Sequence, residues 1–169
     1  MSVVAVLGVL AAIAVPSFIG YTRRARSSEA VHNLGTLFGL AAALYEAERA
    51  DQGVAAGVVT SCVAEPTSLN PASPSPVKQR FTANAGFKEL GFSIADYVYY
   101  GYGISSIGAA GRVSCNPVSG GAGRDVYTFF AHGDLDGDNT QSTFELSVSS
   151  NDSNALYHAR GIYILKELE

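Results

Sequence analysis

The sequence predicts an α+β fold in which a long, protruding N-terminal helix packs on an antiparallel β-sheet head. The first 22 residues are apolar on every face and carry no charge, and an amphipathic helical pattern follows them directly. Later segments alternate apolar and polar residues between turn-forming residues, which is typical of strands. We therefore divide the chain into an apolar half-helix over 1–22, an amphipathic half-helix over 23–52 and a head over 53–169.

The composition fits one ordinary domain with an appendage. The chain has 169 residues, and 11 basic against 15 acidic residues give a net charge of −4. A nucleic-acid-binding surface built on bulk positive charge is therefore not expected.

The apolar run from Val3 to Val15 is shorter than the ~20 residues that cross a bilayer, and residues 17–22 extend it to a marginal span. A secretory signal peptide would need basic residues before the run and a small-residue cleavage site after it. A plain membrane anchor would place the head in the cytoplasm, because basic residues follow the span. Pro16 removes a helical hydrogen bond, so we expect a kink or local melting between Ala12 and Pro16, and Gly8 weakens the same segment.

The amphipathic half-helix has a recurring apolar face. The positions that follow spacings of three and four, apolar except for the last, are Ala30, Leu34, Leu37, Phe38, Ala41, Leu44, Tyr45 and Glu48. A helix that ends near Ala50 would be roughly 75 Å long, so about half of it must protrude from a small head. A protruding apolar half is most simply explained by many copies that bundle these halves together.

The head begins with a Pro-rich loop region over 53–77, where four prolines exclude long helices and central strands. Four strand candidates follow: the Tyr-rich segment around 97–106 with a slip at Tyr99–Tyr100, then RDVYTFFAH, STFELSVSS and LYHARGIYILKEL. They predict an antiparallel sheet of about four strands against the helix. We interpret the tyrosines as residues of a half-buried strand rather than as a ligand-stacking array.

The segment MSVVAVLGVLAAIAVPSFIGYTRRARSSEAVHNL resembles the N-terminal helix of type IV pilins and pilin-like proteins. The likeness lies in Gly8, the LAAIAVP stretch that ends at Pro16, the aromatics Phe18 and Tyr21, and the basic cluster before Ser-Glu-Ala. It covers about the first 50 residues, and the head is similar only loosely.

The resemblance implies a structural subunit, not an enzyme, of a bacterial cell-surface filament used for adhesion, motility or uptake. It implies insertion in the inner membrane before assembly, and as partners an inner-membrane assembly machinery and copies of the chain in a helical homopolymer. Melting of the Gly8–Pro16 segment on assembly is also implied. The helix residues expected to pack in the filament are Val3, Val6, Leu7, Gly8, Leu10, Ile13, Pro16 and Phe18. The alternatives are a pseudopilin of a type II secretion-like periplasmic filament and a membrane-anchored, Ca²⁺-dependent binding module.

The sequence departs from the family at its start. The family has a basic leader, a cleavage point and a glutamate within the apolar run, and none of these is present in residues 1–22. We expect that further residues precede Met1 in the mature subunit, and the contact of that glutamate is assigned to no residue.

Cys62 and Cys115 are the only cysteines and belong to no metal or haem motif. A disulfide between them is favoured over two free buried thiols, provided that the head lies outside the cytoplasm.

The segment GDLDGDNTQSTFE is a candidate Ca²⁺ site. Asp134, Asp136 and Asp138 alternate, and Glu145 stands eleven positions after Asp134, as in an EF-hand loop. Two observations oppose a true EF-hand: Asn139 occupies its glycine position, and the flanks are strand-like. The same residues suit a plain hairpin turn, so both interpretations stay open, and no cofactor is required. His32, His132 and His158 are scattered and match no catalytic or zinc-ligand spacing.

Overall fold

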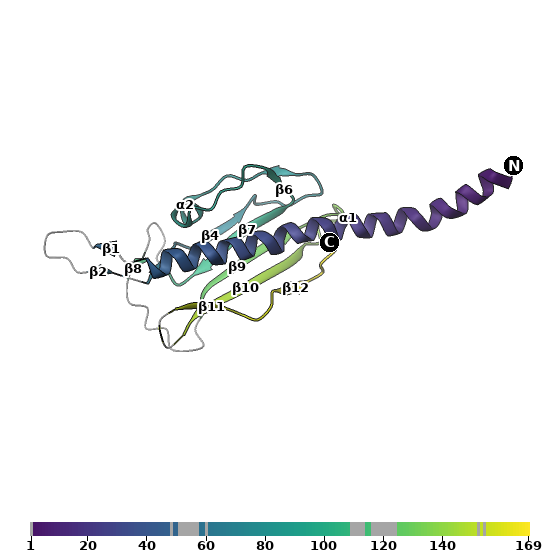
Figure 1. The fold of residues 1–169 in the computed structure, drawn as a ribbon. Helices are drawn as coiled ribbons and strands as arrows, with labels where there is room; N and C mark the ends of the chain where they lie inside the picture. The colour runs from purple at the N-terminus through teal and green to yellow at the C-terminus, as the bar shows by residue number, and fades with distance from the viewer. Residues whose placement is uncertain are drawn as a thin grey trace.

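The computed structural model describes residues 2–47, 49–50, 58–59, 61–108, 114–115, 125–151, 153 and 155–169, and it has the expected α+β architecture (Figure 1). The helices are α1 (Ser2–Glu46) and α2 (Ala85–Leu90). The short strands outside the main sheet are β1 (Arg49–Ala50), β2 (Val58–Val59), β3 (Cys62–Val63), β5 (Gln79–Arg80), β6 (Tyr97–Val98) and β8 (Ser114–Cys115). The strands of the main sheet are β4 (Thr67–Asn70), β7 (Tyr100–Ser106), β9 (Asp125–Gly133), β10 (Ser142–Ser150), β11 (Leu156–His158) and β12 (Tyr163–Leu165).

Helix α1 runs along one face of the sheet and then continues far beyond the head (Figure 1). The expected apolar face is the one that packs on the head: Ala30, Leu34, Leu37, Ala41, Leu44 and Tyr45 are all buried, and Phe38 is half-buried. Glu48, assigned to the same face from the sequence, lies outside the described residues. The spacing of apolar residues therefore identified this face correctly.

The helix ends at Glu46, several residues before the end expected near Ala50, so the 23–52 half-helix is shorter than predicted. The reason is tertiary hydrogen bonding. The N–H of Ser61 donates to the carbonyl oxygen of Tyr45 at 2.8 Å, and Arg49–Ala50 pairs as a strand with Val58–Val59. The backbone at Arg49–Ala50 therefore forms hydrogen bonds with another strand instead of continuing the helix.

The main sheet has the order β11-β10-β9-β7-β4 and β12 also pairs with β10, so it contains six strands instead of about four. The last candidate segment forms two short strands, β11 and β12, which pair with opposite ends of β10. Strand β4 comes from the Pro-rich region and lies at the edge of the sheet, where a neighbouring proline removes no ladder hydrogen bond. All pairings in this sheet are antiparallel, as expected.

At the slip predicted in the Tyr-rich segment, the chain passes from a small two-stranded sheet to the main sheet. Tyr97 and Val98 pair with β5, Tyr99 interrupts the pairing, and β7 begins at Tyr100 in the main sheet. Tyr100 and Tyr102 are fully buried, whereas Tyr97 is exposed. Most of this strand therefore lies deeper in the core than the half-buried strand that we expected.

The core lies between α1 and the sheet. Alternate side chains of β9 and β10 are buried together with the apolar face of α1, and they are Tyr127, Phe129, Ala131, Phe144, Leu146 and Val148. The side chains that alternate with them, Thr128, Phe130, His132, Thr143, Glu145 and Ser147, are half-buried on the other face of the sheet. This alternation gives the sheet one face that packs on α1.

Candidate functional site

The segment Ser2–Thr22 of α1, called the rod below, projects beyond the head (Figure 1). Its residues 2–22 rise about 31 Å at 1.5 Å per residue. The large side chains expected to pack in a filament, Val3, Val6, Leu7, Leu10, Ile13 and Phe18, are each between 59% and 69% exposed. By length and composition the helix can cross a membrane, and none of its most apolar window is buried. So much exposed apolar surface in one segment needs a partner, either lipid or protein.

Pro16 lies inside α1, which is helical on both sides of it. The expected local melting between Ala12 and Pro16 is therefore not present in this structure, although the rod curves gently (Figure 1). The ring of Pro16 removes one hydrogen bond, and an added Cβ at Gly8 would meet open space. Melting of Gly8–Pro16 on assembly remains a prediction.

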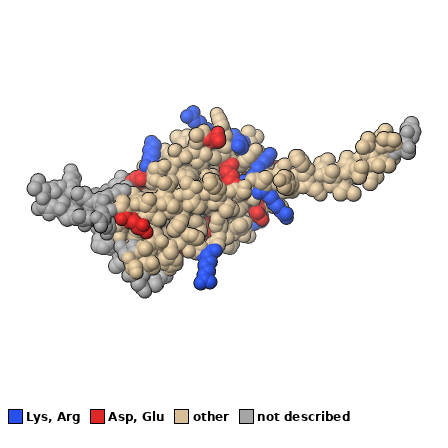
Figure 2. Space-filling model, viewed as in Figure 1, with Lys and Arg blue, Asp and Glu red and all other residues tan. Residues whose placement is uncertain are grey.

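The base of the rod is surrounded by basic side chains that we call the collar: Arg23, Arg24 and Arg26 of α1 and Lys78 of the head. Arg23 Nη1 lies 3.3 Å from Asp136 Oδ2 and donates to the carbonyl oxygen of Leu168 at 3.1 Å. Three residues further along the helix, Arg26 Cζ lies 4.5 Å from the ring centroid of Tyr99, and Lys78 Nζ lies 5.2 Å from the same centroid. Figure 2 shows basic side chains where the rod joins the head and no charged ones along the rod.

Glu29 holds the first full turn of α1 inside the head to strand β7. Its Oε1 accepts hydrogen bonds from the Tyr99 N–H and from the Tyr102 hydroxyl, each at 3.1 Å. Asn33 Nδ2 also donates to the Tyr102 oxygen at 2.7 Å. Burial raises the pKa of Tyr102 far above its ordinary value, and the Glu29 charge adds to this. These contacts join positions about 70 residues apart, and nothing in the local sequence pattern predicts them.

The structure brings Asp134, Asp136 and Asp138 together in the loop between β9 and β10, with carboxylate oxygens within 4.8 Å of one another. Glu145 is not part of this cluster among the described residues. It lies within β10, opposite Phe130 of β9 and Tyr163 of β12. The EF-hand offset therefore does not bring the fourth carboxylate to the other three, because a strand follows the loop.

Backbone groups already use the carboxylates of this loop. Asp134 is only 5% exposed and accepts the N–H of Gly137 at 2.6 Å and of Asn139 at 3.1 Å. Asp138 accepts the N–H of Thr140 at 2.6 Å, which lowers the pKa of Asp138. Gly137 and Asn139 have φ angles of 81° and 66°, which are typical turn conformations for these residue types. These contacts make a hairpin turn stabilised by its own aspartates.

Cys62 and Cys115 form a disulfide and lie opposite each other in the ladder of β3 and β8. The bond ties the segment after α1 to a segment that follows β7. It lies one residue from Ser61, whose N–H caps the end of α1.

The histidines lie on separate elements, as their scattered positions suggested. His32 is exposed on α1, His132 Nδ1 lies 3.1 Å from Thr143 Oγ1, and the ring of His158 packs edge-on against Phe38 at 4.6 Å between centroids. Each has a local partner or faces solvent, and they are not brought together.

The chain matches no protein-family model, no curated protein and no solved structure. The features of the described residues that bear on function are the exposed apolar rod and its junction with the head.

Proposed function

We propose that this chain is the structural subunit of a bacterial type IV pilus-like extracellular filament and polymerises through its N-terminal helix. The observation that carries the proposal is the rod, about 31 Å of helix whose apolar side chains are exposed on every side. Burial of one such Val, Leu, Ile or Phe side chain contributes about 1.5–3 kcal/mol, so bundled rods provide a large driving force for association.

The solvent-facing side of the rest of α1 supports the same proposal. Its exposed residues between 25 and 43 are small or uncharged: Ala25, Ser28, Val31, His32, Gly35, Thr36, Gly39 and Ala43. A helix face that only meets water normally carries charged side chains. Small residues instead let a second helix approach closely, and an added Cβ at Gly35 or Gly39 would meet open space.

Before assembly, the rod resides in the inner membrane, from which an assembly machinery extracts the subunit to the cell surface. The rod has the length of a bilayer core. The Cys62–Cys115 disulfide supports a head outside the cytoplasm, since such bonds persist in oxidising compartments. Copies of the chain and the membrane machinery are thus its partners, and no enzymatic activity is proposed.

A pseudopilin in a short periplasmic filament would use the same helix. The Pro-rich loop region, whose residues Ala72, Ser73 and Val77 are exposed, favours a surface fibre with extended head loops. An abundant long fibre on cells distinguishes the pilin from the pseudopilin.

A matched pair of substitutions tests the proposal. Ile13 on the rod and Ile107 on the head are 67% and 52% exposed. We expect Ile13→Glu to abolish filaments seen by electron microscopy of expressing cells, because it places a charge in the bundle, whereas Ile107→Glu retains them. Full-length chain that stays monomeric without detergent and yields no filaments would refute the proposal.

A further inference from the structure

The collar lies at the depth where a membrane-inserted rod meets lipid headgroups. Residues 2–22 carry no charge, and Arg23 is the first charged residue after them. Because a charged side chain is costly in the hydrocarbon core, a rod that spans the membrane places Arg23 and the residues after it in the headgroup layer. Tyr21, just inside this boundary, is 71% exposed, as expected for an aromatic at a membrane interface.

Head residues lie at the same level as these arginines. Lys78 shares the Tyr99 ring with Arg26, and Asp136 pairs with Arg23. Pro76 lies beside the same loop as Asp136, because an added Cβ at Gly137 would be 3.3 Å from Pro76 Cγ. Val77, between Pro76 and Lys78, is an apolar side chain that is 72% exposed. One side of the head thus faces along the rod.

We propose that the collar and Val77 bind the anionic headgroups of phospholipids while the rod spans the bilayer, so that the head rests on the membrane before assembly. This inference depends on the membrane-inserted stage of the proposed function. Guanidinium groups form paired, charge-assisted hydrogen bonds with phosphate oxygens, and the exposed Val77 enters the same layer.

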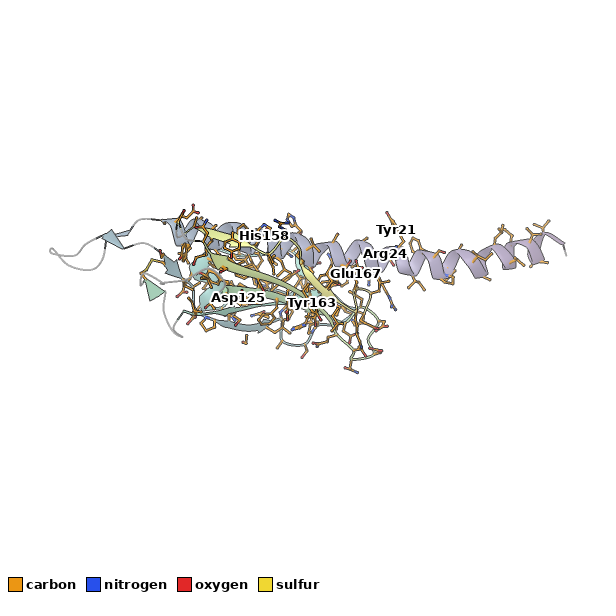
Figure 3. All side chains as sticks on the ribbon, turned by 90° about the horizontal axis from the view of Figure 1, so that it is seen from below. Tyr21, Arg24, Asp125, His158, Tyr163 and Glu167 are labelled. Atoms are coloured by element: carbon orange, nitrogen blue, oxygen red, sulfur yellow. A yellow bond between two sulfur atoms is a disulfide. The ribbon has the colours of Figure 1, made fainter. Side chains whose placement is uncertain are left out.

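The basic side chains available to bind lipid are those that form no ion pair with a carboxylate of the protein. Arg23 is engaged by Asp136, and Glu29 accepts hydrogen bonds from Tyr99 and Tyr102. Glu167, at the same junction, accepts a hydrogen bond from Ser27 at 3.3 Å. Arg24 and Lys78 are exposed and have no carboxylate within ion-pair distance among the described residues. Figure 3 shows Arg24 and Tyr21 where the helix leaves the head, with Glu167 nearby.

Two single-tryptophan variants of the full-length chain test the inference, because the chain contains no tryptophan of its own. Leu10→Trp reports on the rod near the middle of the bilayer, and Val77→Trp reports on the collar. Each is reconstituted into phosphatidylcholine vesicles with or without 30% phosphatidylglycerol. Lipid brominated in mid-chain quenches the first reporter, and a nitroxide on the headgroup quenches the second.

We expect Leu10→Trp to be quenched in both lipid mixtures. Val77→Trp should be quenched at least twofold more strongly with phosphatidylglycerol at 50 mM NaCl, and 500 mM NaCl should remove the difference by screening. Arg24→Gln with Lys78→Gln should also remove it. The matched control is Arg160→Gln with Lys88→Gln, which removes the same charge from exposed positions outside the collar and should have no effect.

The outcomes separate the inference from the function on which it depends. A quenched rod with a collar reporter that responds equally to both lipid mixtures overturns the lipid inference and leaves membrane insertion intact. Extra quenching that survives Arg24→Gln with Lys78→Gln overturns it as well. An unquenched Leu10→Trp overturns both the membrane-inserted stage and the collar inference.

Discussion

Arg23 Nη1 and Asp136 Oδ2 lie 3.3 Å apart, although 113 residues separate them in the chain. The pair joins the base of the rod to the loop between β9 and β10. The same guanidinium donates to the carbonyl oxygen of Leu168, so one side chain connects the helix, a central loop and the C-terminal segment.

Asp136→Asn should lower the free energy of unfolding by about 0.5 kcal/mol, because the ion pair is partly exposed and such pairs contribute little. The loss should shrink further at 500 mM NaCl, where the charges are screened. Urea unfolding at both salt concentrations measures it. Asp96→Asn, at an exposed position, is the control, and a loss that does not depend on salt would argue against an electrostatic origin.

Replacing both cysteines by serine should lower the free energy of unfolding by about 4 kcal/mol, since the disulfide closes a loop of 53 residues in the unfolded chain. The measurement is denaturant unfolding of the double variant. The free energy of unfolding of the wild-type protein should fall by a similar amount when a reducing agent is present. If the reduced and oxidised forms were equally stable, the disulfide would have no stabilising role.

Asp134→Ala should destabilise the head by about 2 kcal/mol, because two backbone N–H groups lose their acceptor at a buried position. Asp138→Ala removes an acceptor at an exposed position and should cost less. Thermal unfolding of both variants compares them, and an equal loss would contradict this ranking.

Calcium titration separates the two interpretations of the same loop. If the aspartate cluster binds Ca²⁺, millimolar Ca²⁺ should raise the Tm of the wild type and not of Asp138→Asn, because binding to the folded state alone stabilises it. An unchanged wild-type Tm leaves a turn stabilised by its own aspartates.

The protein should lose stability at alkaline pH through its buried tyrosines. Burial raises the pKa of Tyr100 from 10.0 to about 12, and it also raises the pKa values of Tyr102 and Tyr127. The unfolded chain releases the Tyr100 proton at lower pH than the folded chain. The free energy of unfolding should therefore be unaffected by this group below pH 10 and should fall between pH 10 and about 12.

Tyr100→Phe should make the fall in the free energy of unfolding above pH 10 less steep, by up to about 1.4 kcal/mol per pH unit. Urea unfolding from pH 7 to 11.5 measures the slope, and the pH 7 value accounts for any change in packing. An unchanged slope in the variant would show that Tyr100 does not contribute.

The spacing and alternation of apolar residues predicted those elements whose structure depends on neighbouring residues in the sequence. The spacing from Ala30 to Tyr45 identified the packed face of α1, and the break at Tyr99 followed from a slip in alternation. Residues that act across the fold gave no such signal. The end of α1 depends on Ser61, the edge strand β4 depends on pairing with β7, and Glu145 lies apart from the aspartates because strand β10 extends it away from the loop.

The cap on α1 has a mechanical consequence. A pull along the rod reaches the head through α1, whose last turn is bonded through Tyr45 to Ser61, next to the disulfide at Cys62. The disulfide joins β3, which follows the helix, covalently to β8, so tension on this segment is not carried by hydrogen bonds alone. Tension along the rod also reaches the sheet through the packed face of the helix, where Ala30, Leu34 and Leu37 are buried in the core.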